Sequence, residues 1–447
     1  MVYDSPLGKT KFPLAPISNG CTFISGYAFK SKDFTDIGHP VIKIKNIQDK
    51  FVTLEDSQCV ASKTIEDLNK FRLNNGDILI AMTGQGSVGR VGRLSFDGNR
   101  APYLNQRVGK FVADEKKLNL SYLYHILTTE HYHNILFNNA SGSGQPNLSP
   151  SLIQSILIPY PEYHLQCKIA KIFDTINNKI ITNKAMNKTL EQMSQTLFKS
   201  WFVDFDPVID NALDARNPIP EALQFRAELR QKIRNSTDFK PLPADVRALF
   251  PSEFEETVLG WVPKGWEIGK LQDLLILQRG FDLPSTQRNI GLHPIIAASG
   301  YNGTHDIAMV KAPGIVTGRS GVLGNVFLIL EDFWPLNTTL WVKELKHATP
   351  CYGYELLKMI DFSSFNGGSA VPTLNRNHIH NLDYLLPPKV LIEKFELFSM
   401  PLHKRVHEFQ KQIQNLTALR DTLLPKLISG ELSLEDLPNL VAQTETA

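Results

Sequence analysis

The sequence predicts an α+β fold in which two mostly-β domains form a pseudo-twofold tandem repeat, joined by two long antiparallel coiled-coil helices. Two observations lead to this prediction. Similar segments recur in the same order in the two halves of the chain, and a heptad pattern of apolar residues follows each series. A chain of 447 residues has room for two or three domains.

The repeat is carried by two pairs of segments. The loop SGSGQPNLSP (141–150) resembles GGSAVPTLNR (367–376), and the glycine-rich stretch TGQGSVG (83–89) resembles TGRSGVLG (317–324). The offset between matching segments shrinks steadily along the chain, as expected for duplicated domains whose loops have changed length. Chance matches would not keep this order. The halves are therefore interpreted as two copies of one domain.

A long helical pattern follows each copy. The expected seam residues recur at spacings of three, four or seven: Ile169, Ile172, Ile176, Ile180, Leu190 and Leu197 in the first copy, and Phe395, Phe398, Leu402, Val406, Phe409, Ile413, Leu416, Leu423 and Leu427 in the second. Such a pattern is typical of a coiled coil, although an ordinary pair of buried bundle helices is the alternative. Each helix of roughly 38 residues would be ~57 Å long.

Polar residues and prolines interrupt the helical pattern. The polar interruptions are Asn183, Asn187, Ser194 and Arg420. Polar residues within an apolar seam can fix the register and the choice of partner. Pro401 and Pro425 are expected to kink or delay the second helix, because proline cannot donate a backbone hydrogen bond.

The chain divides into six predicted parts. They are a first domain at 1–161, a first helix at 162–202, a connector at 203–260, a second domain at 261–388, a second helix at 389–430 and a C-terminal tail at 431–447. Each domain is expected to end in a strand within an apolar stretch closed by proline, at 151–161 and 377–388. The connector, with helical pieces predicted near 219–234 and 243–250, is too long for a simple loop and is expected to pack against another part of the chain.

The composition narrows the class of protein. Hydrophobic residues make up 42% of the chain and the net charge is +2, which excludes a highly basic, histone-like protein but not local basic patches. The four cysteines form no C-x-x-C pair, so reduced thiols and a cytoplasmic location are expected. The N-terminus shows no signal-peptide pattern and no apolar run is long enough for a membrane span, so no membrane partner is expected.

One motif resembles an enzyme site. Gly84–Gly89 matches G-x-G-x-x-G after the apolar stretch DILIAM (77–82), which imitates a dinucleotide-binding loop. The residues that follow, RVGRLSFDG, read as strand and turn, with no helix to receive a phosphate. A tight turn is therefore favoured, and a nucleotide- or cofactor-binding enzyme is kept as the alternative.

Other chemical motifs are weak. The pairs His131-x-His133 and His378-x-His380 have no supporting carboxylate or cysteine nearby in sequence, so no metal site is expected. No Walker pair, G-x-S-x-G or nuclease core is present, and no catalytic residue is assigned. A chain of this size without a catalytic signature is interpreted as a binding or targeting protein.

Polar and basic loops recur in both copies and contain the candidate DNA-contact residues. Arginine and lysine suit guanine and phosphate, and asparagine and glutamine suit adenine. The candidates are Lys30, Lys32, Lys43, Lys45, Gln85, Ser87, Arg90, Arg93, Asn105, Gln106, Arg107, Ser143 and Gln145 in the first copy, and Arg279, Arg288, Tyr301, Asn302, Arg319, Ser320, Asn325, Asn337, Thr338 and Ser369 in the second.

Nearly the whole chain resembles the specificity (S) subunits of type I restriction–modification systems. The most specific segments are ISNGCTFISGYAFKSKDF near the start, LFKSWFVDFDPV (197–208), LFPSEFEETVLGWVPKGWEIGKL (249–271) and LRDTLLPKLISGEL (419–432). The opening of the first copy departs from this pattern, because SPLGKTKFPLAPI (5–17) lacks the Gly-Trp of the second copy.

The resemblance implies a function. Each domain would be a target-recognition domain that reads half of a split, asymmetric site in double-stranded DNA, and the helices would fix the spacer. Two modification (methyltransferase) subunits and two restriction (motor-nuclease) subunits would be partners, and would carry S-adenosylmethionine, ATP and Mg²⁺, with no cofactor on this chain. A stand-alone DNA-binding regulator is the remaining alternative.

Overall fold

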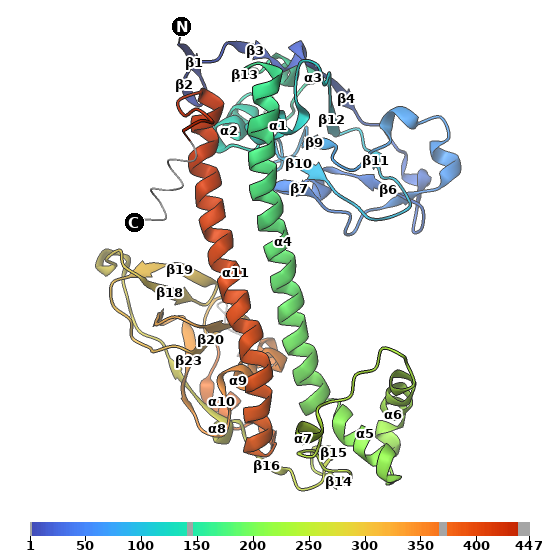
Figure 1. The fold of residues 1–447 in the computed structure, drawn as a ribbon, viewed down its shortest axis with the longest axis vertical. Coiled ribbons are helices and arrows are strands. Elements are labelled where there is room, and N and C mark those ends of the chain that lie inside the picture. Colours follow the sequence, from blue (N-terminus) through green and yellow to red (C-terminus); the bar gives the residue numbers. More distant parts are fainter. Residues whose placement is uncertain (1, 141–145, 366–372, 437–447) are drawn as a thin grey trace. The chain divides into compact units, whose positions relative to one another are not determined.

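The computed structural model describes residues 2–140, 146–365 and 373–436, and its helices and strands form two compact units. Unit 1 contains residues 1–182 and 413–447, and unit 2 contains residues 183–412. The boundary falls inside the two long helices, α4 (Tyr163–Phe202) and α11 (Lys389–Ser429), so each unit holds one β domain and a segment of both helices (Figure 1).

The β domain of unit 1 is built on two sheets. The larger has the strand order β4 (Cys21–Ser25), β12 (Val108–Ala113), β9 (Ile78–Ala81), β10 (Val91–Leu94) and β7 (Lys50–Val52). The smaller has the order β11 (Tyr103–Leu104), β6 (His39–Ile42), β8 (Cys59–Val60) and β5 (Phe34–Thr35). The central strand β9 is buried along its whole length, which explains its uninterrupted apolar sequence. The strand β6 ends at Ile42, because residues 44–46 form a 3₁₀ turn.

The β domain of unit 2 repeats this plan. Its larger sheet has the order β17 (Leu275–Arg279), β23 (Thr339–Leu345), β20 (Gly314–Gly318) and β21 (Val326–Ile329), and its smaller sheet has the order β19 (Gly300–His305), β18 (His293–Ala297) and β22 (Trp334–Pro335). The four strands of the larger sheet match β4, β12, β9 and β10 in order. The parallel pair β18–β22 matches β6–β11. The predicted duplication is thus confirmed at the level of topology.

Further short elements complete the domains. Unit 1 adds the hairpin β1 (Tyr3–Ser5) and β2 (Gly8–Thr10), the pair β3 (Leu14–Pro16) and β13 (Leu157–Pro159), and helices α1 (Leu120–Leu127), α2 (Glu130–Asn138) and α3 (Pro150–Ser155). Unit 2 adds the hairpin β14 (Phe254–Thr257) and β15 (Gly260–Pro263), the pair β16 (Glu267–Lys270) and β24 (Asp383–Leu386), and helices α8 (Leu271–Leu274), α9 (Pro350–Met359) and α10 (Arg376–His380).

A last strand was predicted within 151–161 and within 377–388, and each stretch does contain a short strand, but a helix that was not predicted precedes it. In both copies a short helix comes first, α3 or α10, and only then a short strand, β13 or β24. Capping explains the helices. The Ser149 hydroxyl accepts from the backbone of Leu152 with Pro150 at the first helical position, and the Asn375 side chain accepts from the backbone of Asn377.

Within each unit, a segment of α4 packs beside a segment of α11, and the two run in opposite directions (Figure 1). At two positions the buried seam between the helices differs from the prediction. On α4, Phe173 is fully buried and the predicted Ile172 is half-buried. On α11, Ser399 is fully buried and the predicted Phe398 is 42% exposed. These two seam residues were therefore placed one position early, at equivalent points of the two copies. The helix α11 continues through Pro401 and Pro425, so neither proline ends it.

Two of the predicted polar interruptions make hydrogen bonds between the helices. In unit 1, Arg420 Nη1 donates to Asn177 Oδ1 (3.2 Å), and in unit 2, Asn183 Nδ2 donates to Gln412 Oε1 (3.0 Å). Asn183 is 1% exposed, so a one-residue slip of the helices would leave its buried amide without this partner. These pairs specify the register of the helices in each unit.

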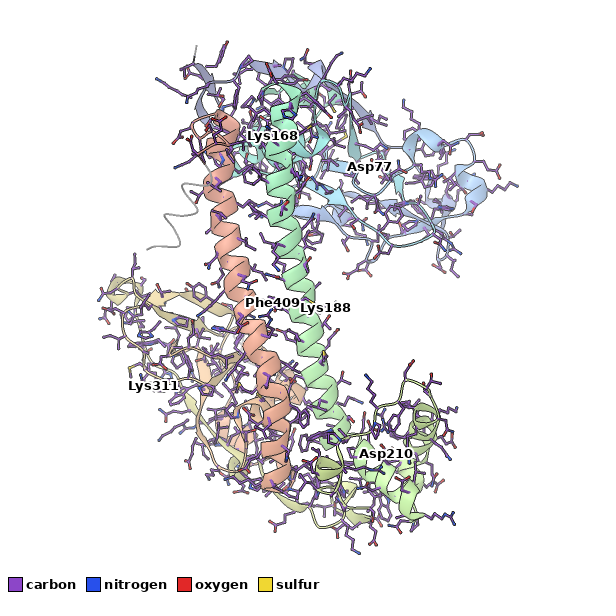
Figure 2. The ribbon with its side chains drawn as sticks, in the orientation of Figure 1. Asp77, Lys168, Lys188, Asp210, Lys311 and Phe409 are labelled. Atoms are coloured by element: carbon purple, nitrogen blue, oxygen red, sulfur yellow. The ribbon has the colours of Figure 1, made fainter. Side chains whose placement is uncertain are left out.

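The connector packs into the core of unit 2, as expected. It contains α5 (Asp206–Ala215), which the sequence did not predict, together with α6 (Glu221–Arg234) and α7 (Ala244–Arg247). Three aspartates spaced four apart on α5 face three arginines spaced four apart on α6. The ion pairs are Asp206 with Arg226 (2.7 Å), Asp210 with Arg230, and Asp214 with Arg234. Asp210 is labelled on α5 in Figure 2.

Candidate nucleic-acid interface

The two motifs that define the repeat meet in each domain. In unit 1, the glycine-rich turn follows β9, and Thr83 forms a β-bridge with Asn147, while Leu148 N donates to Met82 O (2.8 Å). In unit 2, Ser320 bridges Thr373, and Leu374 N donates to Arg319 O (2.9 Å). Asn147–Leu148 and Thr373–Leu374 therefore dock on the glycine-rich turn of their own unit, each anchored by its buried leucine.

A third loop joins each pair. In unit 1, Met82 N donates to Arg107 O (3.0 Å), which places the turn at 105–107 beside the glycine-rich turn. In unit 2, Arg319 N and Ser320 N both donate to Thr338 O (2.8 and 3.1 Å). We call each cluster a three-loop edge. It consists of residues 83–90, 105–107 and 146–147 in unit 1, and residues 319–325, 337–338 and 373–376 in unit 2.

The glycine-rich turn joins two antiparallel strands and does not form a dinucleotide-binding loop. Val91 of β10 pairs with Ile80 of β9, so the chain reverses into the same sheet, whereas a dinucleotide fingerprint leads from a strand into a helix. Gly84 and Gly89 have φ values of +108° and +82°, in the left-handed region that favours glycine. The geometry matches the predicted tight turn and does not support the enzyme alternative.

The three-loop edge of unit 1 gathers several predicted contact residues. Gln85, Gln106 and Arg107 are exposed, and Ser87, Arg90 and Asn105 are half-buried. Of the other candidates, Ser143 and Gln145, like Ser369 in the second copy, lie outside the described residues.

The lysine candidates lie elsewhere in the domain, around the smaller sheet. Lys30 and Lys32 are exposed. Lys45 Nζ donates to Asp56 O (2.7 Å). Lys43 bonds to Gln58 and lies 3.9 Å from the centre of the Phe34 ring. Burial, and then the charge of Lys45, lower the pKa of Lys43.

Arg93 is engaged inside unit 1, which corrects its assignment as a free DNA contact. Its guanidinium donates to Asp174 on α4 (2.8 Å), bonds to Ser121 and lies 4.3 Å from the centre of the Tyr124 ring. His125 Nε2 lies 2.9 Å from the same carboxylate. This cluster fastens α1 and β10 to α4.

In unit 2, the predicted residues fall into two groups. Arg319, Ser320, Asn325, Asn337 and Thr338 belong to the three-loop edge, with Arg279 beside it. Arg288, Tyr301 and Asn302 lie around the smaller sheet, where Arg288 donates to the Asn302 side chain (3.2 Å) and the Tyr301 side chain is exposed. Sequence reasoning missed Arg376, which lines the same groove as Arg279 and Arg319.

A buried polar cluster in unit 2 contains residue types found in hydrolases. Ser194 Oγ on α4 donates to Glu355 Oε1 on α9 (2.7 Å) and lies 3.0 Å from His403 Nε2 on α11. All three residues are 5% exposed or less, so a substrate has no access to them. Ser194 Oγ also lies 2.6 Å from Ser399 Oγ on α11. The cluster therefore links α4, α11 and the helix α9 of the second domain through hydrogen bonds.

This cluster predicts a pH dependence of stability. Burial, and then the charge of Lys358, lower the pKa of His403 from 6.5 to about 4. In the unfolded chain His403 takes up a proton below about pH 6.5, whereas in the folded chain it does so only near pH 4. The contribution of neutral His403 to the stability of unit 2 is therefore present above pH 6.5 and is lost as the pH falls. The loss amounts to about 3 kcal/mol. Burial raises the pKa of Glu355, which acts in the opposite direction.

The His403→Gln variant isolates this contribution. All five tryptophans lie in unit 2, so their fluorescence during urea unfolding reports on that unit. We expect wild type to lose more stability than His403→Gln between pH 7 and pH 4.5. Parallel pH profiles of the two proteins would contradict this assignment.

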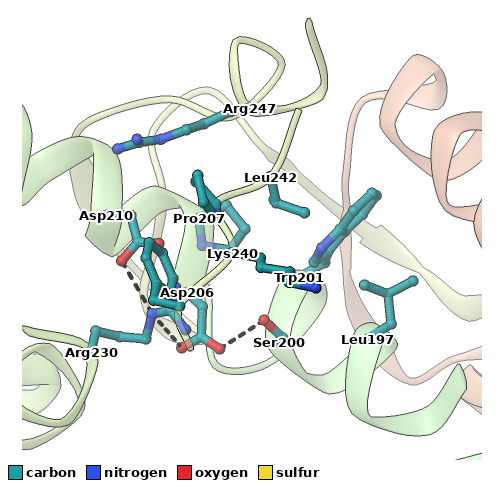
Figure 3. Close-up of a pocket in the computed structure, with 12 residues that line it drawn as sticks. Leu197, Ser200, Trp201, Asp206, Pro207, Asp210, Arg230, Lys240, Leu242 and Arg247 are labelled. Carbon is teal, nitrogen blue, oxygen red and sulfur yellow. Dashed lines mark hydrogen bonds and ion pairs between the residues drawn. The ribbon is translucent and has the colours of Figure 1, made fainter. Parts of the chain in front are cut away.

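A pocket of about 230 Å³ lies where α4 meets the connector (Figure 3). Asp206 accepts from Ser200 Oγ (2.7 Å) and pairs with Arg226, and Asp210 pairs with Arg230. Both carboxylates are thus neutralised by arginines, so the pocket offers neither of them as a free acid or base.

Among all the residues that the structure describes, no group of three potential metal ligands occurs. No helix among these described residues is long and apolar enough to cross a membrane.

Comparison with known proteins shows which family the chain resembles. The family model of the type I restriction modification DNA specificity domain matches residues 16–192. The specificity subunit of the type I restriction enzyme HindI from Haemophilus influenzae is 25% identical over 446 residues, covering 86% of this chain and 92% of the relative. The chain is similar to the specificity subunits of type I restriction–modification systems.

Two further proteins described as specificity subunits are similar to this chain. The specificity subunit of the type I restriction enzyme MjaIX from Methanocaldococcus jannaschii is 25% identical over 343 residues, covering 71% of this chain and 70% of the relative. The crystal structure of a type I specificity subunit from M. genitalium has a TM-score of 0.59 at 16% identity, covering 94% of this chain and 96% of that one. The second likeness concerns the fold alone.

Proposed function

We propose that this specificity subunit reads a bipartite, asymmetric site in double-stranded DNA, with one half-site contacted by each three-loop edge. The proposal rests on a comparison of the two domains, which share a strand framework but differ in their loop residues. Both domains share strand order and loop docking, yet their edges present different side chains. Gln85, Gln106 and Arg107 belong to the first edge, and Arg319 and Asn325 to the second. Such residues suit base edges and phosphates, so different sequences at the two half-sites follow.

The paired helices would set the distance between the half-sites. The helix α4 has 40 residues, which correspond to ~60 Å at ~1.5 Å per residue. This length exceeds one turn of DNA, ~34–36 Å, so the helices are long enough to separate two readers by more than a turn. The register-fixing pairs Asn177–Arg420 and Asn183–Gln412 would keep that length constant.

The chain would also act as a scaffold for two modification subunits and two restriction subunits. Several large apolar side chains on the long helices are exposed, among them Ile181, Met193 and Leu397, the last at 70%. Exposed apolar side chains on otherwise polar helices suit a protein interface. In this proposal S-adenosylmethionine, ATP and Mg²⁺ are bound by those partners and the chemistry of methylation and cleavage is theirs.

The near-neutral charge of the chain fits shared DNA binding. With a net charge of +2, the chain as a whole attracts DNA phosphates only weakly, and the partners would supply further phosphate contacts. We therefore expect weak, salt-sensitive DNA binding by the chain alone and tight, specific binding by the complex. Tight sequence-specific binding by the isolated chain at physiological salt would contradict the proposal that the partner subunits supply part of the DNA contacts.

Exchange of the first domain tests the proposal. Residues 1–161 are replaced by the first domain of another specificity subunit, and the chimaera is assembled with modification subunits. Sequencing of methylated adenines in DNA then gives the recognised motif. We expect a change in one half-site, with the other half-site and the spacer retained. A change in both half-sites would contradict the modular reading, and failure to co-purify with a modification subunit would favour a stand-alone regulator.

A further inference from the structure

Three arginines line one groove beside the three-loop edge of unit 2. The groove has a volume of about 480 Å³ and is lined by Arg279 at the end of β17, Arg319 after β20 and Arg376 at the start of α10, together with Leu340, Thr373, Leu374 and Asn375. These arginines come from three separate segments of the chain, so the fold brings their charges together. Arginine presents a planar fork of donors that matches a phosphate group.

The charge of this groove is only partly compensated. Arg279 Nη2 lies 3.5 Å from the Asp282 carboxylate, which also accepts from Asn337. Arg319 Nη1 donates only weakly to the Asn337 carbonyl, at 3.4 Å. Within the described residues, neither Arg319 nor Arg376 forms an ion pair. At least two positive charges therefore remain for a ligand.

The three positions of unit 1 that correspond to these arginines carry no cation, although Arg90 and Arg107 belong to the same edge. Leu374 bonds to Arg319 as Leu148 bonds to Met82, so Arg319 corresponds to Met82. Arg376 follows Leu374 by two residues, as Pro150 follows Leu148. The correspondence of Arg279 comes from strand register: Arg279 pairs with Leu340 of β23, and Ser25 pairs with Gly109 of β12.

The centre of each larger sheet supports this last match. Leu340 is also the partner of Thr317 in β20, and Gly109 is the partner of Ile80 in β9. The arginine triad of unit 2 therefore replaces Ser25, Met82 and Pro150 of unit 1. The two copies share the strand framework, but this arginine triad occurs in the second copy only.

We propose that Arg279, Arg319 and Arg376 form a DNA phosphate-binding site specific to the second domain. The inference rests on the proposed function and adds an asymmetry to it: the second half-site is held through its backbone at a point where the first is not. A backbone contact of this kind positions the domain on DNA and carries no sequence information itself. The ligand is one phosphate of duplex DNA.

The test measures DNA binding by the full chain as a function of salt. Fluorescence anisotropy is recorded with two duplexes of equal length, one containing only A·T pairs and one containing only G·C pairs. In the triple variant R279Q/R319Q/R376Q, the slope of log affinity against log salt is expected to become shallower by about 1 on both duplexes. At about 0.1 M salt this corresponds to roughly tenfold weaker binding.

Two controls separate charge from structure. The triple variant R279K/R319K/R376K keeps the charge and is expected to keep the wild-type slope. The Lys264→Gln variant removes one charge from the β14–β15 hairpin, where Lys264 pairs with Glu253, and is expected to leave the slope unchanged. If the glutamine triple variant fails to fold, Arg376→Gln alone serves, because this side chain is exposed.

The outcomes distinguish the inference from the function on which it rests. Absence of salt-dependent DNA binding by the wild type would overturn the proposed function. Wild-type binding with an unchanged slope in the glutamine variant would overturn the phosphate site alone. A loss confined to the G·C duplex would assign the arginines to guanine edges and would also overturn the phosphate site.

Discussion

Replacement of Trp201 by alanine is expected to reduce the free energy of unfolding of unit 2 by about 3–5 kcal/mol. Trp201 is 1% exposed, and its ring packs against Phe250 and Phe395 at centroid distances of 5.3 and 6.2 Å. The residue joins α4 to the connector and to α11, so its removal opens a cavity at the meeting point of three segments. Urea unfolding followed by the fluorescence of the other four tryptophans measures the change.

Trp261 provides the matched control. It lies in the β14–β15 hairpin of the same unit and is 37% exposed. Trp261→Ala is expected to cost less than Trp201→Ala, because more than a third of the Trp261 surface already faces solvent. Equal losses in the two variants would show that Trp201 is not the central packing residue of this junction.

The second large effect is expected for Asp174→Ala, at about 2–4 kcal/mol. Asp174 accepts from Ser121 Oγ (2.6 Å) and from Arg93 (2.8 Å), and His125 lies beside it. Alanine would leave the Arg93 charge and the buried His125 without their carboxylate. Hydrogen exchange of peptides that cover α1 and β10 reports this loss within unit 1.

The same carboxylate predicts a pH effect of definite sign. Burial raises the pKa of Asp174, but hydrogen bonds from His125 and Ser121 and the charge of Arg93 outweigh it, so the pKa lies well below its usual value. Its contribution to stability is therefore present above about pH 4 and is lost as the pH falls further. Asp97→Ala, at an exposed aspartate of the same unit, is the control and should change little. Equal effects of the two variants would refute the anchoring role of Asp174.

Patterns of neighbouring residues predicted those parts of the fold that depend mainly on neighbouring residues. The duplicated motifs, the glycine-rich turn and the two long helices were all recognisable, because turns need glycine and paired helices need a heptad seam. The seam was misplaced by one residue where Phe398 looked like a core residue and Ser399 did not. The buried position at Ser399 depends on hydrogen-bond partners from α4 and α9, which no periodicity reveals.

The candidate site was harder to predict for a related reason. Arg93 and Arg319 look alike in sequence, but Arg93 is bound to Asp174, which lies 81 residues away on α4. Arg376 was overlooked because no basic residue stands beside it, although the fold brings it to Arg279 and Arg319. Long-range pairing thus decides which cations remain available to DNA.

The proposed function makes one central claim: the paired helices would hold two DNA-reading domains at a fixed spacing. Lengthening α4 alone between Asn177 and Ser194, for example after Thr182, would shift one helix against the other and break either the Asn177–Arg420 pair or the Ser194–Ser399 pair. Both helices must therefore grow together. Seven residues inserted after Thr182 and seven after Gln412 keep the pairs of each unit intact.

The most direct measurement is the methylated motif produced by this doubly lengthened chain in complex with modification subunits. Seven helical residues add ~10 Å, which corresponds to about three base pairs at ~3.4 Å each. The expected result is a pair of unchanged half-sites separated by a spacer about three base pairs longer. An unchanged spacer, or altered half-sites in a complex that still methylates DNA, would contradict the claim that the helices set the spacing.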